Sequence, residues 1–158
     1  MDYVIIGNSA GAVGCIEGIR SVDKAGKITL IASEPYHTYS RPLISYLLEG
    51  KTDLERMKYR PDSYYEAMGV QARLGVKASA IQPQEHRVLL ETGEEIPYDK
   101  LLVATGSVPL VPPMEGLETV EKQFTFLSLD DAKALEGALT PESRVLLVGA
   151  GLLGLKCA

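Results

Sequence analysis

Apolar residues along this chain gather in short runs. Between these runs lie turns and segments whose apolar residues have helical spacing, which is the pattern of an α/β protein. Residues 2–6 and 27–31 are two such runs, rich in β-branched side chains. Strands that are apolar at nearly every position are buried on both faces, as in a parallel sheet. Between the two runs, small and apolar residues recur at helical spacing from Ala10 to about Val22, and Gly26 is expected to close that helix. The pattern therefore predicts a strand–helix–strand unit near the amino terminus.

The middle of the chain consists of shorter apolar segments separated by turn residues. Residues 43–48 read as a short helix. Segments at 78–81, 86–90 and 95–96 predict a small antiparallel meander. Residues 98–103 end in an apolar run, which predicts a return to the buried parallel sheet.

A stiff connector precedes the last third of the chain and marks a domain boundary. Its punctuating residues are Pro109, Pro112, Pro113 and Gly116. Beyond the connector, Ser128 and Asp131 have the spacing of a capping box, which predicts a helix to about Leu139. Residues 145–148 then predict a final buried strand.

Composition narrows the classes of function. The 158 residues suffice for one α/β domain and the beginning of another. Sixteen basic against 21 acidic residues give a net charge of −5 without a basic cluster, so nucleic acid is not an expected partner. The apolar runs are far shorter than the ~20 residues that a membrane span needs. The two cysteines and two histidines form no metal-ligating cluster. The low number of cysteines fits a reducing cytoplasm.

Two glycine-rich turns follow apolar runs, at Gly7–Ala12 and at Gly149–Gly154. In dinucleotide-binding folds, N–H groups at a helix start point at the pyrophosphate, and small residues let the backbone approach it. Against the G-x-G-x-x-G template, the first turn has serine at the second position and alanine at the third, whereas the second turn matches throughout. Both turns are candidate dinucleotide sites, although tight packing alone also explains a small-residue turn.

Glu34 strengthens the first of these turns. It follows the second predicted strand, 22 residues after Ala12, where an acidic residue usually accepts from a ribose hydroxyl and disfavours a 2′-phosphate. The competing interpretation is a solvated glutamate at a strand end. The order of strand, turn, helix, strand and acid favours nucleotide binding, and no such context follows the second turn.

These features, in this order, resemble the FAD-dependent pyridine nucleotide-disulfide oxidoreductases. The chain looks closest to the branch of NADH oxidases, rubredoxin and ferredoxin reductases and the flavin portion of nitrite reductase. The resemblance covers nearly the whole chain and rests on four segments, namely residues 4–12, 33–36, 39–43 and 98–109. It implies a Rossmann-like α/β fold with an FAD-binding domain at residues 1–110, a connector at 111–127 and the start of an NAD-binding domain at 128–158.

The resemblance also implies which residues meet the cofactors. Glu34 would accept from the adenosine ribose, and Ala78 would meet the adenine through its backbone. Arg41 and Pro42 would lie near the isoalloxazine ring or the pyrophosphate, although without the resemblance Arg41 would be read as part of a surface ion pair. The FAD pyrophosphate would be surrounded by Gly7, Ser9, Ala10, Gly11 and Ala12. The flavin cofactor would be flanked by Ala104, Thr105 and Gly106. NAD would be received by Gly149, Gly151 and Gly154. No catalytic residue and no metal ligand is expected.

The chain departs from the family pattern in three respects. Disulfide-type members carry a redox cysteine in the segment that corresponds to residues 40–45, and this chain has none there. Several members place a lysine near the flavin where Tyr46 stands here, and we expect Tyr46 to be a packed core residue. The family's second flavin motif, a Gly-Asp pair, and most of the NAD domain are missing from the sequence. We therefore expect the chain to be the amino-terminal portion of a longer enzyme.

For the full-length enzyme the resemblance implies FAD as cofactor and hydride transfer to it from NAD(P)H. Electrons would pass on to oxygen, to a rubredoxin- or ferredoxin-like protein, or to a nitrite reductase centre. The portion present is expected to have little activity alone, and a homodimer is left open. The alternative is a nucleotide-binding or interaction module without a redox role. A lone NAD-dependent dehydrogenase domain is disfavoured because the meander and the return strand belong to the flavin-type arrangement.

Overall fold

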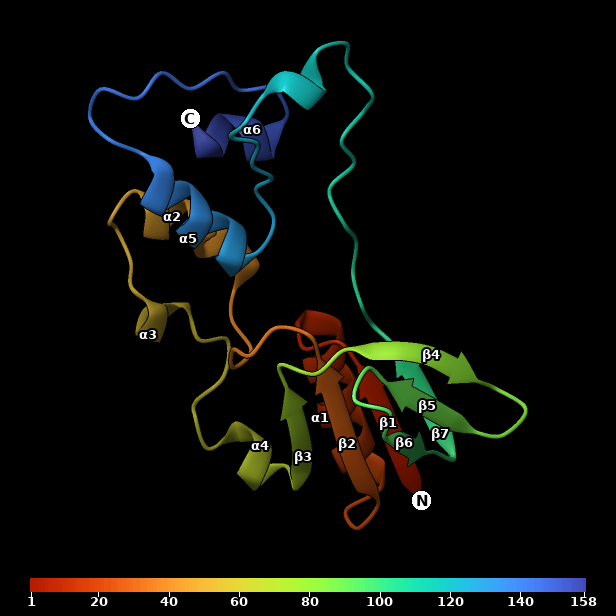
Figure 1. The fold of residues 1–158 in the computed structure, drawn as a ribbon. Helices are drawn as coiled ribbons and strands as arrows, with labels where there is room; N and C mark the ends of the chain where they lie inside the picture. Colours follow the sequence, from red (N-terminus) through yellow and green to blue (C-terminus); the bar gives the residue numbers. More distant parts are fainter. The chain divides into compact units, whose positions relative to one another are not determined.

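The computed structural model describes residues 1–158 and divides into two compact units (Figure 1). The first unit comprises Met1–Tyr39 and Lys58–Gly106, and the second comprises Ser40–Met57 and Ser107–Ala158. Both units are therefore built from two separate stretches of chain. The division at residues 1–110, 111–127 and 128–158 stays a prediction. No helix combines the length and the apolarity that crossing a membrane requires.

A four-stranded parallel sheet forms the centre of the first unit, in the order β3-β2-β1-β7. Its strands are β1 (Asp2–Ile6), β2 (Lys27–Ala32), β3 (Val70–Leu74) and β7 (Lys100–Val103). The helix α1 (Ala10–Val22) connects β1 to β2, and α4 (Tyr64–Ala67) precedes β3 (Figure 1). The predicted strand–helix–strand unit and the return strand are confirmed.

The prediction assigns no strand to the segment that forms β3. This strand lies at the edge of the sheet and pairs only with β2. Its five residues are partly or fully exposed and include Gln71 and Arg73. An edge strand of this kind lacks the continuous apolar run by which a buried parallel strand is recognised.

The three predicted meander strands are present as a separate antiparallel sheet, in the order β4-β5-β6. They are β4 (Ala78–Gln82), β5 (Arg87–Leu90) and β6 (Glu95–Pro97). The strand β5 begins one residue later than predicted because His86 has φ +52°, a left-handed turn conformation. Apart from that shift, the antiparallel meander is confirmed.

The parallel sheet buries both of its faces, and alternate residues of each strand supply the two core clusters. On one face, Ile5 and Leu30 pack with Ala12, Val13 and Ile16 of α1. The cluster on the other face joins the parallel sheet to the meander and consists of Val4, Ile6, Ile31, Val88, Leu90 and Ile96. The first unit therefore has three layers, with a helix, a parallel sheet and an antiparallel sheet.

The second unit contains short helices and no strand. Its elements are the 3-10 turn η1 (Arg41–Leu43), α2 (Ile44–Leu48), α3 (Leu54–Met57), the 3-10 turn η2 (Leu117–Thr119), α5 (Leu129–Ala138) and α6 (Leu152–Cys157). The helix α2 packs against α5. The predicted capping box is confirmed, because the N–H of Asp131 donates to Ser128 Oγ (3.1 Å) and the N–H of Ser128 donates to Asp131 Oδ2 (2.8 Å).

Two local predictions are wrong. Residues 145–148 form no strand, and Leu146 is 89% exposed. An extended segment becomes a strand only when its N–H and C=O groups pair with a neighbouring strand, and the second unit offers none. Gly26 does not close α1, because Asp23 follows the helix and its Oδ1 accepts from the N–H groups of Ala25 (3.0 Å) and Gly26 (2.7 Å).

Tyr64 offers a test of the packing between α1 and α4. Its side chain is 4% exposed and its hydroxyl donates to the carbonyl of Val13 (3.3 Å). Burial raises the pKa of Tyr64 from 10.0 to about 12. Because the folded-state pKa is raised, this contribution to stability is fully present below pH 10.0 and is lost as the pH rises through about 12.

We expect Tyr64→Phe to lower the free energy of unfolding by about 1 kcal/mol at pH 8 and to flatten its decline between pH 10 and 12. Urea unfolding at a series of pH values measures both effects. Tyr59→Phe is the matched control, since Tyr59 is 40% exposed. An alkaline profile of Tyr64→Phe identical to that of the parent chain would contradict this account.

Candidate functional site

Three strands of the parallel sheet end at one edge, and predicted site residues follow each of them. The strands β1, β2 and β7 end at Ile6, Ala32 and Val103. Their paired registers place these ends side by side, and the carboxyl edge of such a sheet is where ligands bind in open α/β folds. Gly7, Glu34 and Ala104–Gly106 come directly after these strands, so the fold brings together segments that are far apart in sequence.

Backbone hydrogen bonds join the ends of β1, β2 and β7 around Gly7. The N–H of Gly7 donates to the carbonyl of Ile31 (2.8 Å), and the N–H of Ala104 donates to the carbonyl of Ile6 (2.7 Å). Gly7 has φ +117°, and a Cβ placed there would lie 2.1 Å from the carbonyl oxygen of Ala104. Only glycine satisfies both the dihedral angle and the close approach at this position.

The two departures from the glycine template are explained by the backbone conformation at Ser9 and by packing at Ala12. Ser9 has φ −126° and ψ −164°, an extended conformation that any residue adopts, so the second template position needs no glycine here. Ala12 is fully buried in the core cluster beneath α1, so the third position requires a small side chain. Gly7 is the residue of the first turn whose conformation demands glycine.

The amino-terminal end of α1 is open to an anion. Ser9 is the N-cap residue but makes no side-chain capping bond, and the first turn contains no acidic residue. Ala10 and Gly11 are exposed. The N–H groups at the start of a helix carry partial positive charge and lack partners within the helix. This end of α1 therefore has the features of a phosphate site.

Glu34 follows β2 at the same edge of the sheet, and a neighbouring phenol holds it. The hydroxyl of Tyr39 donates to Glu34 Oε2 (2.7 Å). The carbonyl of Glu34 accepts from the N–H of Gly75 (3.2 Å), which fixes the backbone as well. The sequence predicts Glu34 at this site but gives no signal for Tyr39, because a tyrosine five residues further along a loop belongs to no periodic pattern.

Ala78 begins β4, three residues after Gly75, whose N–H donates to the carbonyl of Glu34. The N–H of Val76 donates to the carbonyl of Ala32 (2.9 Å), which joins the loop before β4 to the end of β2. The backbone of Ala78 pairs with Leu90 across the meander. Its side chain packs against the core cluster between the two sheets, which leaves its backbone as the part that could meet a ligand.

A polar network missed by the sequence analysis surrounds the first turn. Asn8 lies within that turn, and its side chain is bonded to Tyr36 and Tyr65. The loop after β2, which includes Tyr36, also contains two buried polar atoms without a partner in the chain, Thr38 Oγ1 and His37 Nε2. Buried polar atoms are almost always hydrogen-bonded to protein, water or ligand. The open helix end and these two atoms are consistent with a polar dinucleotide at this edge.

The second unit contains the other predicted site residues. Arg41 and Pro42 lie in η1, and Gly151 is the N-cap of α6. Gly149 has φ +117°, as Gly7 has, and a Cβ on Gly154 would lie 2.1 Å from the carbonyl oxygen of Gly149. The second glycine-rich turn is therefore as tightly folded as the first, although no strand precedes it.

The prediction that Tyr46 is a packed core residue is wrong. Its side chain is 39% exposed, and Lys156 Nζ lies 5.6 Å from the centre of its ring. A cation at this distance from an aromatic face is attracted to it. The pair joins α2 to α6 within the second unit, so Tyr46 contributes to packing between helices without being enclosed.

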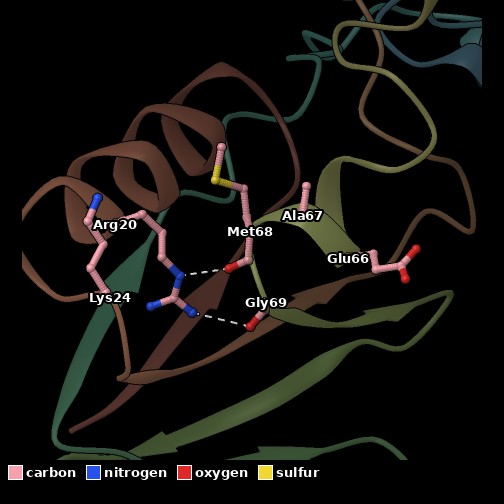
Figure 2. Close-up of a pocket in the computed structure, with 6 residues that line it drawn as sticks. All are labelled: Arg20, Lys24, Glu66, Ala67, Met68 and Gly69. Carbon is pink, nitrogen blue, oxygen red and sulfur yellow. Dashed lines mark hydrogen bonds between the residues drawn. The ribbon is translucent and has the colours of Figure 1, made fainter.

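A surface pocket of the first unit lies at the opposite end of α1 (Figure 2). Arg20 Nε donates to the carbonyl of Met68 (2.7 Å), and its terminal nitrogens donate to the carbonyls of Gly69 (3.2 Å) and Asp23 (3.1 Å). The guanidinium thus ties the end of α1 to the turn before β3. Because its nitrogens already have backbone partners, this pocket is a structural junction.

Comparisons with known proteins agree with this geometry. A family model described as pyridine nucleotide-disulphide oxidoreductase matches residues 1–158. The epsilon subunit of NADH-dependent phenylglyoxylate dehydrogenase from Aromatoleum evansii is 33% identical over 156 residues, which cover 99% of this chain and 37% of that protein. The large subunit of nitrite reductase (NADH) from Escherichia coli is 33% identical over 156 residues, covering 98% of this chain and 18% of that protein.

Among solved structures, the covalent putidaredoxin reductase–putidaredoxin complex matches with a TM-score of 0.86 and 26% identity. That match covers 99% of this chain and 38% of the other. The chain thus spans less than two fifths of the length of each of these relatives. The resemblance inferred from the sequence and the α/β fold class are confirmed. The family match also supports FAD as the cofactor and NAD(P)H as the substrate of this class of oxidoreductase.

Gly7→Ala tests the backbone constraint on which the site rests. The added methyl group meets a backbone oxygen at 2.1 Å in a left-handed conformation, so we expect the free energy of unfolding to fall by about 2 kcal/mol or more. Gly18→Ala is the matched control, because Gly18 lies within α1 with open space around an added Cβ. The control should raise stability by up to about 1 kcal/mol. Equal urea midpoints for the two variants would contradict the constraint.

Proposed function

We propose that the carboxyl edge of the first unit binds FAD, because this chain belongs to the pyridine nucleotide-disulphide oxidoreductase family. The observation that carries the proposal is the convergence of the open end of α1, Glu34 and the turn at Ala104–Gly106 at that edge. These are the positions at which a dinucleotide meets a doubly wound sheet. The two unsatisfied polar atoms of the neighbouring loop support the same location.

Each group at the edge has a physical task in this proposal. The N–H groups of Ala10, Gly11 and Ala12 would donate to the pyrophosphate, and the Ser9 hydroxyl is near enough along the chain to add another donor. The carboxylate of Glu34, held by Tyr39, would accept from the adenosine ribose.

Other residues of the first unit would enclose the cofactor. The backbone of Ala78 would meet the adenine, and Ala104, Thr105 and Gly106 would flank the cofactor after β7. Thr105 and Gly106 are exposed, and Ala104 is fixed by its bond to β1, so this turn presents a defined backbone at the edge.

The second unit would contribute to the same enzyme. Arg41 and Pro42 would lie near the isoalloxazine ring or the pyrophosphate, and Gly149, Gly151 and Gly154 would receive NAD(P)H. Bound FAD supplies the redox chemistry, accepting hydride from the nicotinamide and releasing electrons to an acceptor. The protein's own contribution is binding, orientation and exclusion of water, and no side chain here is assigned a catalytic step.

The chain would then be the amino-terminal part of an FAD-dependent NAD(P)H oxidoreductase. This chain matches only 37% and 18% of the length of the two relatives described above, which supports this assignment. Residues 1–110 would be the FAD-binding portion, 111–127 a connector and 128–158 the start of the NAD-binding portion. The acceptor would be oxygen, a small redox protein or a nitrite reductase centre. The names of two relatives support the last two, since one is a nitrite reductase subunit and the other a putidaredoxin reductase in complex with putidaredoxin. The low cysteine content favours the cytoplasm.

The direct test is ligand binding by the chain itself. We expect FAD and ADP to raise its unfolding temperature, FAD to bind weakly, and NADH oxidation to be negligible. Glu34→Gln should weaken ADP binding about tenfold, equivalent to about 1.4 kcal/mol, measured by titration calorimetry. Glu66→Gln is the control, since Glu66 is exposed at the pocket at the other end of α1.

Other outcomes would point to other functions. Stabilisation by ADP or NAD but not by FAD would favour a nucleotide-binding module without a redox role. A much larger shift with NAD than with FAD would favour an NAD-dependent dehydrogenase domain. Stoichiometric yellow flavin together with rapid NADH turnover would contradict the expectation that the chain is not competent alone.

A further inference from the structure

Three hydrogen bonds outside the glycine template tie the first turn to the loop that contains Glu34. Asn8 Nδ2 donates to the carbonyl of Tyr36 (3.1 Å). The hydroxyl of Tyr65 donates to Asn8 Oδ1 (2.7 Å) and accepts from the N–H of Thr38 (3.1 Å). The bonds join the turn after β1, the loop after β2 and the helix α4. We call this set the Asn8–Tyr65 clamp.

The direction of each bond in the clamp is determined by chemistry. The N–H of Thr38 can only donate, and the carbonyl of Tyr36 can only accept. An Asn8 amide turned the other way would bring its oxygen against the carbonyl of Tyr36, so its nitrogen must face that carbonyl. Its oxygen then faces Tyr65, whose single O–H must donate to it. The three bonds of the clamp are therefore compatible in one arrangement of donors and acceptors.

The clamp is partly buried, which makes its bonds stronger than fully exposed ones. Thr38 is fully buried. The centre of the His37 ring lies 4.5 Å from that of the Tyr65 ring, and the centre of the Tyr64 ring lies 5.7 Å from it. These contacts fix the ring of Tyr65, and its partial burial raises the pKa of the phenol, so the hydroxyl stays protonated as a donor.

We propose that Tyr65 is a positioning residue for the dinucleotide site, acting through Asn8 on the phosphate-binding turn. The Asn8 amide sits between Gly7 and Ser9, so holding it sets the distance from the open end of α1 to the loop that contains Glu34. A dinucleotide spans that distance, with its pyrophosphate at the helix end and its ribose at the acid. The inference rests on the proposed function, since it concerns the same site.

The test compares ligands that need the spacing with one that does not. ADP and FAD have both a pyrophosphate and a ribose, whereas adenosine has no phosphate. We expect Tyr65→Phe to weaken ADP and FAD binding about tenfold while adenosine binding changes less than twofold. Asn8→Ala should have the same effect, and the double variant should be no weaker than either single one, because both remove the same clamp.

Tyr64→Phe is the matched control. Tyr64 neighbours Tyr65 in α4 and has a buried hydroxyl, but it donates to Val13 and not to the turn. Its variant should lose stability and keep the parent ratio of ADP to adenosine affinity. Asn8 lies on a partly exposed turn, so Asn8→Ala remains informative even if Tyr65→Phe fails to fold.

The outcomes separate the two proposals. Parent chain that binds neither ADP nor FAD would overturn the proposed function and this inference together. Normal binding by the parent with equal losses for ADP and adenosine in Tyr65→Phe would overturn the inference alone, because it would indicate a general loss of structure. Additive losses in the double variant would do the same.

Discussion

The close approach of Gly7 to the backbone of Ala104 determines how the carboxyl edge of the sheet is built. Here the chain leaves β1 and passes so close to the carbonyl oxygen of Ala104, the residue after β7, that no Cβ fits at Gly7. Two backbone bonds, from Gly7 to Ile31 and from Ala104 to Ile6, close the same contact from both neighbouring strands. The start of α1 is thereby held close to the end of β1, and its first residues, Ala10 and Gly11, are exposed.

Polar contacts then orient what the backbone has brought together. Tyr39 holds the carboxylate of Glu34, and the clamp between Asn8 and Tyr65 holds the glycine-rich turn. Both phenols lie outside the glycine template; Tyr39 contacts the acidic residue after β2, and Tyr65 contacts the turn after β1. The apolar core supplies the layers, while a small number of buried or half-buried hydroxyl and amide groups sets their spacing at the edge.

Much of this could be predicted from the sequence because local signals and tertiary packing agree in the first unit. The buried strands, the helix after Gly7, the meander and the capping box at Ser128 all have strong periodic or capping patterns. The edge strand at 70–74 does not, since all five of its residues are partly or fully exposed. Residues 145–148 have the pattern of a strand but no pairing partner in the chain.

The clamp could not be predicted for a different reason. Asn8, Tyr36 and Tyr65 are up to 57 residues apart in sequence, and only the fold makes them neighbours. The serine in place of glycine at the second template position is likewise resolved by a dihedral angle, which no letter pattern reports. Sequence reasoning therefore identifies which segments meet at the edge, while the side chains that fix their spacing emerge from the structure.

Amide chemical shifts during titration with ADP would test the central claim most directly. The account predicts that the largest shifts fall on the N–H groups of Ala10, Gly11 and Ala12 and on the loop at Glu34. The N–H groups around Arg20 and Gly69, at the opposite end of α1, should stay unchanged. Shifts concentrated at that opposite end, or absent from the whole first unit at saturating ADP, would contradict a nucleotide site at the carboxyl edge.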